Sequence, residues 1–469
     1  MHNTSMPTTI CAIATAPGGA IGIVRISGQE AISMASSIFT PAKGPALTER
    51  KTHTLTYGNI IDPDGNVVDE VLVSLMRAPH SYTGEDCVEI SCHASSYILA
   101  QVMQLLIQAG CQTARPGEFT QRAFLNGKMD LSQAEAVADL IASTTAANHR
   151  MAMHQLKGGF SKELHELRER LLHLTSLMEL ELDFSDHEDL EFADRTELLA
   201  LASQTESHIG RLCQSFKLGN ALKRGLPVAI VGETNAGKST LLNALLGEER
   251  ALVSDIHGTT RDTVEECINM DGTLIRFIDT AGIRHTSDVV EQMGIERTFT
   301  KMDEAEVVIW MVDATQAEAQ FAALAPDIAP HIAGKQLVIV LNKADLLPHT
   351  SLESFRTASP FPKAQMLLIS AQSTEGVNRL RHILSQTISA LTAGTSPEDT
   401  IVSNARHYEA LTQARTALLR VIDGLHSGLS GDFISQDLRE CLHYLGSIIG
   451  EISSNDVLHN IFKHFCLGK

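Results

Sequence analysis

Residues Leu226 to Leu246 read LPVAIVGETNAGKSTLLNALL. An apolar, strand-like run breaks at Gly232 into a loop, after which apolar residues recur with the spacing of a helix. The loop fits G-x-x-x-x-G-K-[ST], in which glycines let backbone N–H groups wrap a polyphosphate, the lysine reaches its terminal phosphates and the hydroxyl binds Mg²⁺. The positive end of the helix faces the same anion. The stretch predicts a phosphate-binding loop with the contact residues Asn235, Ala236, Gly237, Lys238, Ser239 and Thr240, Ser239 being the Mg²⁺ ligand.

Three later motifs each end a strand-like apolar run. In TLIRFIDTAG, the aspartate can hold Mg²⁺ through water and the glycine N–H can meet a γ-phosphate. In QLVIVLNKAD, the final carboxylate can accept hydrogen bonds from the N–H donors of guanine, which adenine lacks. MLLISA is expected to support the base. Together the motifs predict a guanine-nucleotide GTPase domain of α/β fold, and they add to its site Asp279, Thr280, Ala281, Gly282, Asn342, Lys343, Ala344, Asp345, Ser370 and Ala371.

The chain is long and acidic. Its 469 residues should form two or three domains with sizeable cores. Lys plus Arg number 37 and Asp plus Glu 56, which gives a net charge of −19. This balance argues against sequence-independent coating of nucleic acid, although a local basic face could still bind RNA.

The remaining composition predicts a cytoplasmic protein. No apolar run approaches membrane-spanning length, and the first residues, MHNTSMPTTIC, lack the basic flank of a signal peptide. The eight cysteines are scattered without C-x-x-C pairs, so we expect neither a disulfide framework nor a zinc site.

Residues 8–94 are predicted to form a β-rich module. Five short β-branched runs, TICAIAT, AIGIVRISG, HTLTYGNI, VVDEVLVSLM and CVEISCHA, are separated by Gly, Pro and Asp turns. The segment YILAQVMQLLIQAG then predicts a helix that ends at Gly110. Residues 114–127, ARPGEFTQRAFLNG, are dense in Arg, Glu and Asn, and their composition alone favours a solvated inter-domain turn.

From Asp130 onward the pattern is helical. Asp130 can cap the helix DLSQAEAVADLIAS, with Gln133 reaching back as in a capping box. The acidic segment ELELDFSDHEDLEFAD is expected to be a solvated helix junction. Helical signals return at 405–424, 432–450 and 455–465, so the α/β domain is inserted between two helical stretches that should pack together. One apolar stripe predicts a long amphipathic helix and consists of Leu164, Leu167, Leu171, Leu174 and Leu177.

Four segments resemble the MnmE/TrmE family of tRNA-modifying GTPases. They are SYTGEDCVEI at 81–90, RPGEFTQRAFLNGKMDL at 115–131, NAGKS followed by GTTRD, and the terminal CLGK. The resemblance runs end to end. It implies a multidomain α+β and α/β fold: a β-rich folate-binding and dimerisation domain at 1–125, a discontinuous helical domain at 126–221 and 391–469, and an inserted Ras-like G domain at 222–390.

The resemblance also implies a function. The family works as a homodimer with an FAD-dependent partner, in a heterotetramer, and builds a carboxymethylaminomethyl or aminomethyl group on C5 of the wobble uridine of certain tRNAs. The one-carbon unit comes from a reduced folate, formyl- or methylene-tetrahydrofolate, and the FAD belongs to the partner. The implied folate contacts are Arg25, Glu89, Lys128 and Lys469. Two cations would suit the folate glutamate tail and one carboxylate the pterin donors.

Two departures from the family pattern lie near the implied folate pocket. The loop APGGAIG is a residue shorter than the usual PGxGGxG and lacks its arginine, and Cys92-His93-Ala94 replaces the usual C/G-H-G-G.

The G domain departs from Ras-like switches at Ile283, where a glutamine would orient the attacking water. By resemblance, Glu291 takes this role through bridging water, and a K⁺ ion occupies the place of an arginine finger. The K⁺ ligands would be Asn235, Ser254, Ile256 and Thr259, and Thr260 would be the second Mg²⁺ ligand. The whole implied switch segment at the nucleotide is Ser254, Asp255, Ile256, His257, Gly258, Thr259 and Thr260.

Two alternatives stay open on the sequence alone. Cys466 is a candidate catalytic thiol that could attack a uracil ring or carry a one-carbon unit, but a near-terminal cysteine can equally be a packing residue. The chain could also be a GTP-dependent assembly switch of the ribosome-biogenesis type. Such a switch usually carries a basic RNA-binding appendage, which the acidic flanks here do not provide.

Overall fold

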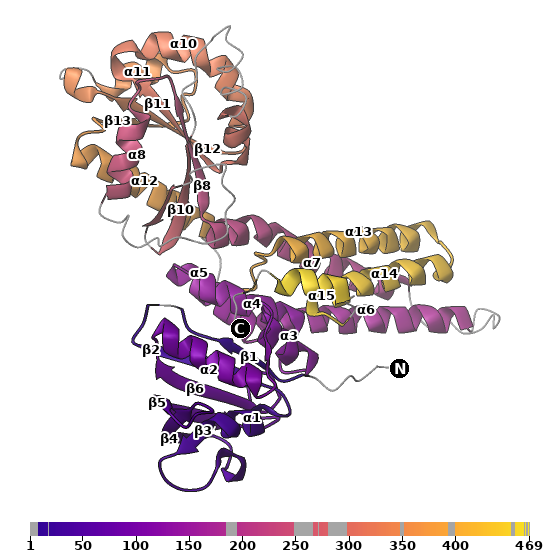
Figure 1. Ribbon diagram of the computed structural model, residues 1–469. Helices are drawn as coiled ribbons and strands as arrows, with labels where there is room; N and C mark the ends of the chain where they lie inside the picture. Colours follow the sequence, from indigo (N-terminus) through magenta and orange to yellow (C-terminus); the bar gives the residue numbers. More distant parts are fainter. Residues whose placement is uncertain are drawn as a thin grey trace. The chain divides into compact units, whose positions relative to one another are not determined.

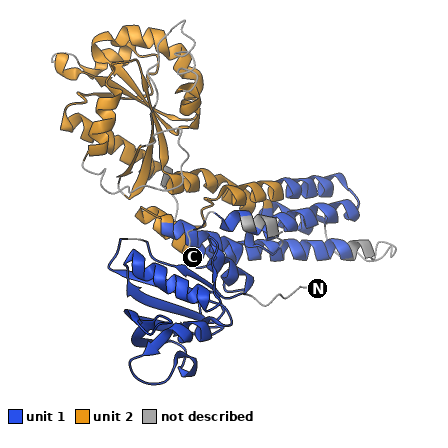
Figure 2. Ribbon diagram, in the orientation of Figure 1, with its two compact units in different colours: residues 1–141, 155–205, 416–469 blue, residues 142–154, 206–415 orange. Residues whose placement is uncertain are grey.

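The computed structural model describes residues 8–16, 18–183, 195–247, 266–270, 272–279, 298–347, 351–392, 399–451, 455–463, 465 and 468. These residues form two compact units (Figure 2). The first comprises residues 1–141, 155–205 and 416–469, and the second 142–154 and 206–415. Each unit contains one sheet, and the mixture of sheets and helices confirms the predicted multidomain α+β class. The four domain boundaries stay a prediction.

The first unit begins with a seven-stranded sheet (Figure 1). Its strands are β1 (Ile10–Ile13), β2 (Ile21–Ser27), β3 (Phe39–Pro41), β4 (Thr54–Ile61), β5 (Val67–Met76), β6 (Cys87–His93) and β7 (Gln112–Thr113), in the order β3-β4-β5-β6-β2-β1-β7. All neighbours are antiparallel except β1 and β7. The five predicted strand runs are confirmed, as is the helix α2 (Ser96–Gln108). Helix α1 (Ala31–Ile38) was not expected.

This sheet has one buried and one open face. Alternate residues of β2, β5 and β6 pack with α1 and α2 in a single apolar core, which includes Val24, Val73, Ile90, Val102 and Leu106. On the opposite face the apolar side chains of Leu55, Tyr57 and Leu72 are 62%, 51% and 41% exposed, and Tyr57 lies directly across from Leu72. An antiparallel sheet that packs on one side only produces this alternation.

The expectation of a solvated turn at 114–127 is wrong. Residues Glu118–Leu125 form helix α3, and Glu118 and Arg122 are each only 9% exposed. Arg122 donates to both carboxylate oxygens of Glu85, to Glu118 at 3.1 Å and to the carbonyl oxygen of Thr8 at 2.8 Å. The charged residues that suggested solvent exposure are therefore paired with one another inside the first unit, where paired charges can be buried.

We expect Arg122→Met to lower the free energy of unfolding of the first unit by about 3 kcal/mol, because it removes the buried cation shared by the largely buried Glu85 and Glu118 carboxylates. The matched control is Arg115→Met, since Arg115 also pairs with Glu118 but is 66% exposed. That change should cost under about 1 kcal/mol. Urea unfolding of both variants measures the difference, and equal losses would contradict the assigned role of Arg122.

The pH dependence of the Arg122 effect follows from Glu118. Burial tends to raise the pKa of Glu118, but the Arg115 backbone N–H and the Arg122 guanidinium together hold that pKa below its ordinary 4.5. A carboxyl with a lowered folded pKa stabilises the protein above its unfolded pKa and loses this effect as pH falls through the folded pKa. The gap between wild type and Arg122→Met should therefore be full at pH 7 and shrink below about pH 4.5.

Helix α4 (Leu131–Ala142) begins with the predicted capping box. The backbone N–H of Asp130 donates to Gln133 Oε1 and that of Gln133 donates to Asp130 Oδ1, both at 2.9 Å. Besides α1 to α3, this unit contains all of α4 except Ala142, together with α6 (Gly159–Asp183), α14 (Gly431–Ile449) and α15 (Asn455–Phe462). The stripe on α6 is confirmed through Leu174, but among the side chains described up to residue 179 its last buried position is Met178 instead of Leu177. This stripe packs against α14.

The second unit contains a six-stranded sheet in the order β13-β12-β11-β8-β10-β9 (Figure 1). All pairs are parallel except β9 with β10. Its strands are β8 (Leu226–Gly232), β9 (Glu266–Met270), β10 (Thr273–Asp279), β11 (Val307–Asp313), β12 (Gln336–Asn342) and β13 (Gln365–Leu368). Its helices are α8 (Lys238–Leu246), α10 (Ala317–Ile328), α11 (Leu352–Ala358) and α12 (Thr374–Thr392), with a further helical segment at 298–304.

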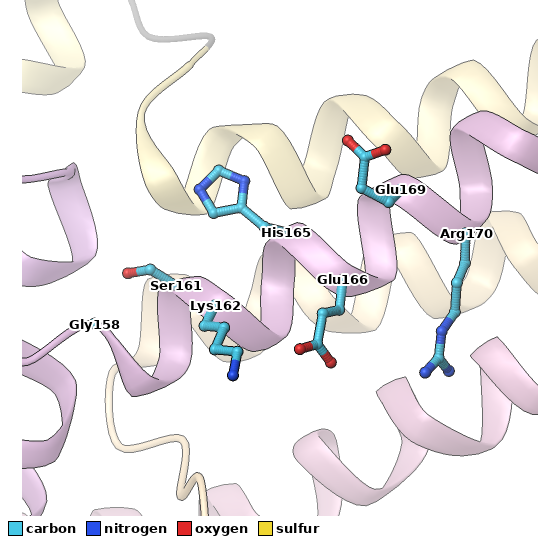
Figure 3. A pocket seen from close by; sticks show the side chains of 7 residues that line it. All are labelled: Gly158, Ser161, Lys162, His165, Glu166, Glu169 and Arg170. Carbon is cyan, nitrogen blue, oxygen red and sulfur yellow. The ribbon is translucent and has the colours of Figure 1, made fainter.

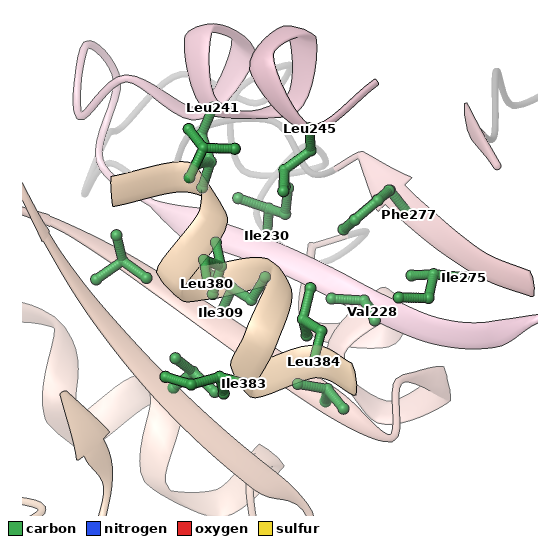
Figure 4. Close-up of a cluster of buried hydrophobic side chains, with 14 of the residues drawn as sticks. Val228, Ile230, Leu241, Leu245, Ile275, Phe277, Ile309, Leu380, Ile383 and Leu384 are labelled. Atoms are coloured by element: carbon green, nitrogen blue, oxygen red, sulfur yellow. The ribbon is translucent and has the colours of Figure 1, made fainter. Parts of the chain in front are cut away.

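Helices cover both faces of this sheet. On one face, Val228, Ile230 and Ile309 pack with Leu241 of α8 and Leu384 of α12 (Figure 4). On the other face, the alternate residues of the same strands pack with α10 and α11 around the buried Trp310. Burial on both faces explains why the central strands are apolar at nearly every position between their ends.

Two helices join this sheet to the rest of the chain, α7 (Arg195–Arg224) and α13 (Ala405–Ser427), and α5 (Ala146–Leu156) lies mostly in the second unit as well. Within the second unit α7 and α13 pack together as expected. Arg415 pairs with Glu206 at 2.7 Å, and the rings of Phe216 and Tyr408 stack with centroids 4.3 Å apart. The polypeptide therefore enters and leaves this sheet along paired helices.

Candidate functional site

The phosphate-loop sequence lies between β8 and α8 in a conformation that only glycine fits at two positions. Gly232 has φ +150°, and a Cβ there would lie 2.2 Å from the carbonyl oxygen of Met311. Gly237 has φ +100°, and its Cβ would lie 2.2 Å from Asn342 Nδ2. Both glycines thus permit a close backbone approach as well as a backbone conformation that side chains disfavour. Asn235 also has positive φ, +68°, and is exposed.

The lysine of the loop lies over the loop itself. Lys238 Nζ donates to the carbonyl oxygens of Gly232, at 3.0 Å, and Glu233, at 2.8 Å. Ser239 and Thr240 follow in the first turn of α8, and both are exposed. An ammonium group, hydroxyls and a helix N-terminus therefore occur within three residues of one another, which is the donor set that a polyphosphate with Mg²⁺ requires.

Asn342 joins three of the predicted motifs. Its Nδ2 donates to the carbonyl oxygen of Ala236 at 2.8 Å, and its Oδ1 accepts from the backbone N–H of Ala371, also at 2.8 Å. The side chain is buried, with 4% exposed. The phosphate loop, the NKAD segment and the Ser370–Ala371 segment therefore meet at one carboxyl-end edge of the sheet.

The NKAD segment turns sharply after Asn342. Lys343 has φ +63° and its Nζ pairs with Asp313 Oδ2 at 2.5 Å. Ala344 donates its N–H to Ile369, and Asp345 follows in a short 3₁₀ turn with its side chain exposed. The Asp345 side chain is therefore open to solvent at the end of this turn.

Several predicted residues lie outside the part of the chain that the structure describes. Asp279 ends β10, paired with Ile230 of β8, but its side chain is not described. The others outside the described residues are Ser254, Asp255, Ile256, His257, Gly258, Thr259, Thr260, Thr280, Ala281, Gly282, Ile283, Glu291, Cys466 and Lys469, as is most of the acidic segment at 179–194.

Arg25 and Glu89 face each other across β2 and β6. Arg25 Nε lies 2.8 Å from Glu89 Oε1, and Arg25 Nη1 donates to the carbonyl oxygen of Gly468 at 3.1 Å. The guanidinium carbon also lies 5.7 Å from the ring centroids of Tyr82 and Phe119. The predicted folate pair therefore lies next to Gly468, within the same unit.

Lys128 and Arg25 contact the same loop. Lys128 Nζ donates to the carbonyl oxygen of Pro79 at 3.0 Å, and Arg25 lies over the ring of Tyr82. Arg122 reaches this loop as well, through Glu85. Residues 79–85 thus link three cationic side chains that are far apart in the sequence.

One open cavity of about 630 Å³ lies along α6 and contains none of the predicted site residues (Figure 3). Its charged lining comes from Lys162, His165, Glu166, Glu169 and Arg170, with both signs of charge interspersed. In the described part of the chain, no cluster of His, Cys, Asp and Glu could hold a metal ion, and no helix is long and apolar enough to cross a bilayer.

Three polar residues of the second unit were not singled out from the sequence. They are Asp313 at the end of β11, Gln320 on α10 and Glu233 in the phosphate loop. Gln320 accepts a hydrogen bond from the Asp313 backbone N–H and donates one to the Glu233 carboxylate. The run VVIWMVD contained a signal for Asp313, because polar residues at the carboxyl ends of parallel strands lie at the ligand-binding edge. Gln320 gave no such signal.

The doubly covered sheet, the phosphate loop and the NKAD turn at one edge define a P-loop GTPase domain. Family models match the chain as "GTP-binding protein TrmE N-terminus" over residues 9–128 and "MnmE helical domain" over residues 131–466. The chain belongs to the MnmE family and is a tRNA modification GTPase, as the sequence resemblance predicted.

Relatives match over nearly the whole chain. A protein from Bacteroides thetaiotaomicron, tRNA modification GTPase MnmE, is 59% identical over 465 residues, with 98% of this chain and 99% of the relative covered. The Phocaeicola vulgatus protein of the same name is 56% identical over 495 residues, with 98% and 99% covered. Among solved structures, a variant of Aquifex aeolicus Era bound to GDP.AlF4- is 31% identical, covers 41% of this chain and 66% of its own, and has a TM-score of 0.28.

Proposed function

We propose that this tRNA modification GTPase acts at C5 of the wobble uridine of certain tRNAs, where it takes part in adding a carboxymethylaminomethyl or aminomethyl group, in the cytoplasm. The observation that carries the proposal is the match, at 59% identity and over 98% of the chain, to a relative named tRNA modification GTPase MnmE. Local geometry supports both halves of the proposal: a guanine-nucleotide site in one unit and paired charges beside the C-terminus in the other.

The nucleotide is proposed to bind along the edge where β8, β10, β11 and β12 end. Lys238 and the backbone N–H groups of Asn235 to Thr240 would hold the phosphates, and Ser239 with Thr260 would hold Mg²⁺. The exposed Ser239 in the first turn of α8 fits such a ligand. Mg²⁺ supplies charge neutralisation at the β- and γ-phosphates. Asp345 would read the guanine edge.

Asp345→Asn should reduce the preference for GTP over ATP by at least about tenfold, because the amide presents donors as well as acceptors to the guanine N–H groups. Competition binding with GTP, ATP and xanthosine triphosphate measures the preference. Xanthosine triphosphate should gain affinity in the variant, since its C2 oxygen accepts where guanine donates. An undiminished preference for GTP would remove Asp345 from the base site.

The tRNA chemistry is proposed to use a reduced folate bound by Arg25, Glu89, Lys128 and Lys469, together with an FAD-dependent partner. Arg25 and Glu89 are each about a quarter exposed or less, so their charges are partly desolvated and available to one side. The Arg25 contact to Gly468 supports a site that includes the C-terminal segment. Cys466 belongs to that segment and is proposed as a reactive thiol.

Alanine at Arg25, Glu89 or Lys128 should lower the affinity for 5-formyltetrahydrofolate by about ten- to a hundredfold each, as expected for loss of one charged contact. Titration calorimetry measures this. Lys43→Ala, an exposed lysine of the same unit, is the matched control. Wild-type affinity in all three variants would place the folate site elsewhere.

The chain is further proposed to act as a homodimer through its N-terminal module, and in a heterotetramer with its partner. The open sheet face with Leu55, Tyr57 and Leu72 supports an association surface, because exposed apolar side chains that adjoin one another favour burial.

GTP hydrolysis is proposed to need K⁺, held by Asn235, Ser254, Ile256 and Thr259, and pairing of two G domains.

Mass spectrometry of tRNA nucleosides from a deletion strain tests the proposal. We expect loss of the C5 side chain at the wobble uridine, restored by the wild-type gene and not by a Lys238→Ala variant. Unchanged wobble uridines would overturn the tRNA-modifying function and leave a GTP-dependent assembly switch as the better account of the GTPase domain.

A further inference from the structure

Four residues connect the two loops of the nucleotide site by a second route, away from Asn342. Glu233 lies in the phosphate loop and Lys343 in the NKAD turn. Between them, Gln320 Nε2 donates to Glu233 Oε2 at 2.9 Å, Gln320 Oε1 accepts from the backbone N–H of Asp313 at 2.9 Å, and Asp313 Oδ2 pairs with Lys343 Nζ at 2.5 Å. We call Glu233, Gln320, Asp313 and Lys343 the outer bridge.

The middle of the outer bridge is buried and its geometry is fixed. Gln320 is 4% exposed and Asp313 is 7% exposed. Asp313 Oδ1 also accepts from the N–H and the hydroxyl of Thr315. The side-chain amide of Gln320 accepts from Asp313 through Oε1 and donates to Glu233 through Nε2, so these two neighbours set its orientation. Changing any member leaves a buried polar group without its partner.

Charge also holds the bridge together. Burial tends to raise the pKa of Asp313, but the Lys343 ammonium and the two Thr315 donors lower it overall, so Asp313 stays ionised. The same lysine has a left-handed backbone, φ +63°, which is costly for a residue with a side chain unless its surroundings hold it. The pair with Asp313 provides such a restraint.

At its other end, the bridge restrains the phosphate loop. The Glu233 carbonyl oxygen accepts from Lys238 Nζ at 2.8 Å and from the N–H of Ala236 at 3.3 Å. Tethering the Glu233 side chain to α10 therefore limits where the carbonyl that contacts the phosphate-binding lysine can lie. The same tether cannot affect base choice directly, since Asp345 is not part of it.

We infer that Gln320 and Asp313 are positioning residues of the nucleotide site, which set the separation of the phosphate loop from the NKAD turn and thereby the affinity for guanine nucleotides. The inference rests on the proposed nucleotide site. It distinguishes two functions at that site: Asp345 selects the base, and the outer bridge sets how tightly either GDP or GTP is held.

Exchanging the amide of Gln320 and the carboxylate of Glu233 tests the inference. In Gln320→Glu, one carboxylate oxygen still accepts from Asp313 N–H while the other faces the Glu233 carboxylate, and we expect GDP and GTP affinity to fall by about ten- to a hundredfold. Adding Glu233→Gln restores the hydrogen bond in the opposite direction, because the new amide at position 233 donates to the new carboxylate at position 320. The double variant should therefore regain most of the affinity. Glu318→Gln, an exposed change on the same helix, should bind as wild type.

The readouts are fluorescent GDP titration, the GTP-to-ATP affinity ratio and the melting temperature without nucleotide. Lower affinity at an unchanged ratio, restored by the swap, supports the inference. Equal affinity in Gln320→Glu and wild type overturns it, as does a double variant no better than the single one. Should Gln320→Glu not fold, the half-buried Glu233→Ala replaces it, and wild-type affinity there overturns the inference. Wild-type protein that binds no guanine nucleotide would instead refute the proposed site itself.

Discussion

Gly237→Ala should bind GTP at least about 100-fold more weakly than wild type. The φ of +100° costs an L-residue about 1–2 kcal/mol, and the new methyl would lie 2.2 Å from Asn342 Nδ2. Asn342 must then move, which breaks its hydrogen bonds to Ala236 and Ala371, at about 1–3 kcal/mol for buried partners left unpaired. The free variant would relax away from the phosphate-binding conformation to avoid both penalties, so GTP binding must restore them. A total of about 3 kcal/mol, within the combined range of about 2–5 kcal/mol, gives the stated factor at about 1.4 kcal/mol per tenfold.

Gly334, in the same unit, provides a control in which an added Cβ causes backbone strain without a steric clash. Gly334 has φ +74°, and a Cβ there would meet nothing within 4 Å. Gly334→Ala should therefore lose about 1 kcal/mol of stability and keep its nucleotide affinity. Fluorescent GTP titration and thermal unfolding measure both variants. Equal affinities for Gly237→Ala and wild type would mean that Asn342 does not organise the nucleotide site.

The sequence was most informative where function depends on contiguous residues. The phosphate loop and the NKAD turn are short loops that follow apolar strands, so spacing along the chain and position in the sheet carry the same information. The outer bridge is different. Its members come from the loop after β8, from β11, from α10 and from the loop after β12, and only folding brings Gln320 between Glu233 and Asp313.

Composition failed where charges are paired inside the protein. The Arg and Glu content of 114–127 indicated solvent exposure, but Arg122 is enclosed by Glu85, Glu118 and the Thr8 carbonyl. Polarity predicts exposure only for a group whose partner is water, and tertiary pairing reverses the inference. Helix α1 was missed for a local reason, since it has eight residues and no side-chain cap to mark its start.

Glu291→Ala should hydrolyse GTP at least about 100-fold more slowly than wild type while binding GTP with unchanged affinity. A side chain that positions the attacking water acts in the transition state, where such a group contributes about 10²–10⁴-fold, and touches no part of bound GTP. The motif DTAG is followed by Ile283, which cannot hydrogen-bond to water, so another group must hold it. Single-turnover hydrolysis and equilibrium GTP titration separate the two effects.

The same mechanism predicts faster turnover in K⁺ than in Na⁺ at equal ionic strength, by about tenfold or more, because a cation between the β- and γ-phosphates offsets the charge that develops there. Carbonyl-type oxygens replace the loosely held water of K⁺ more readily than that of Na⁺.

Two variants test this mechanism. Asn235 is exposed in the phosphate loop with φ +68° and can direct a side-chain oxygen toward such an ion. Asn235→Ala should therefore lose the difference between the two salts and retain GTP binding. Glu291→Ala should keep the salt preference at its lower rate, since water positioning and charge neutralisation are separate contributions. Equal rates in K⁺ and Na⁺ for the wild type would exclude the cation from the mechanism, and full activity of Glu291→Ala would assign the water to another residue.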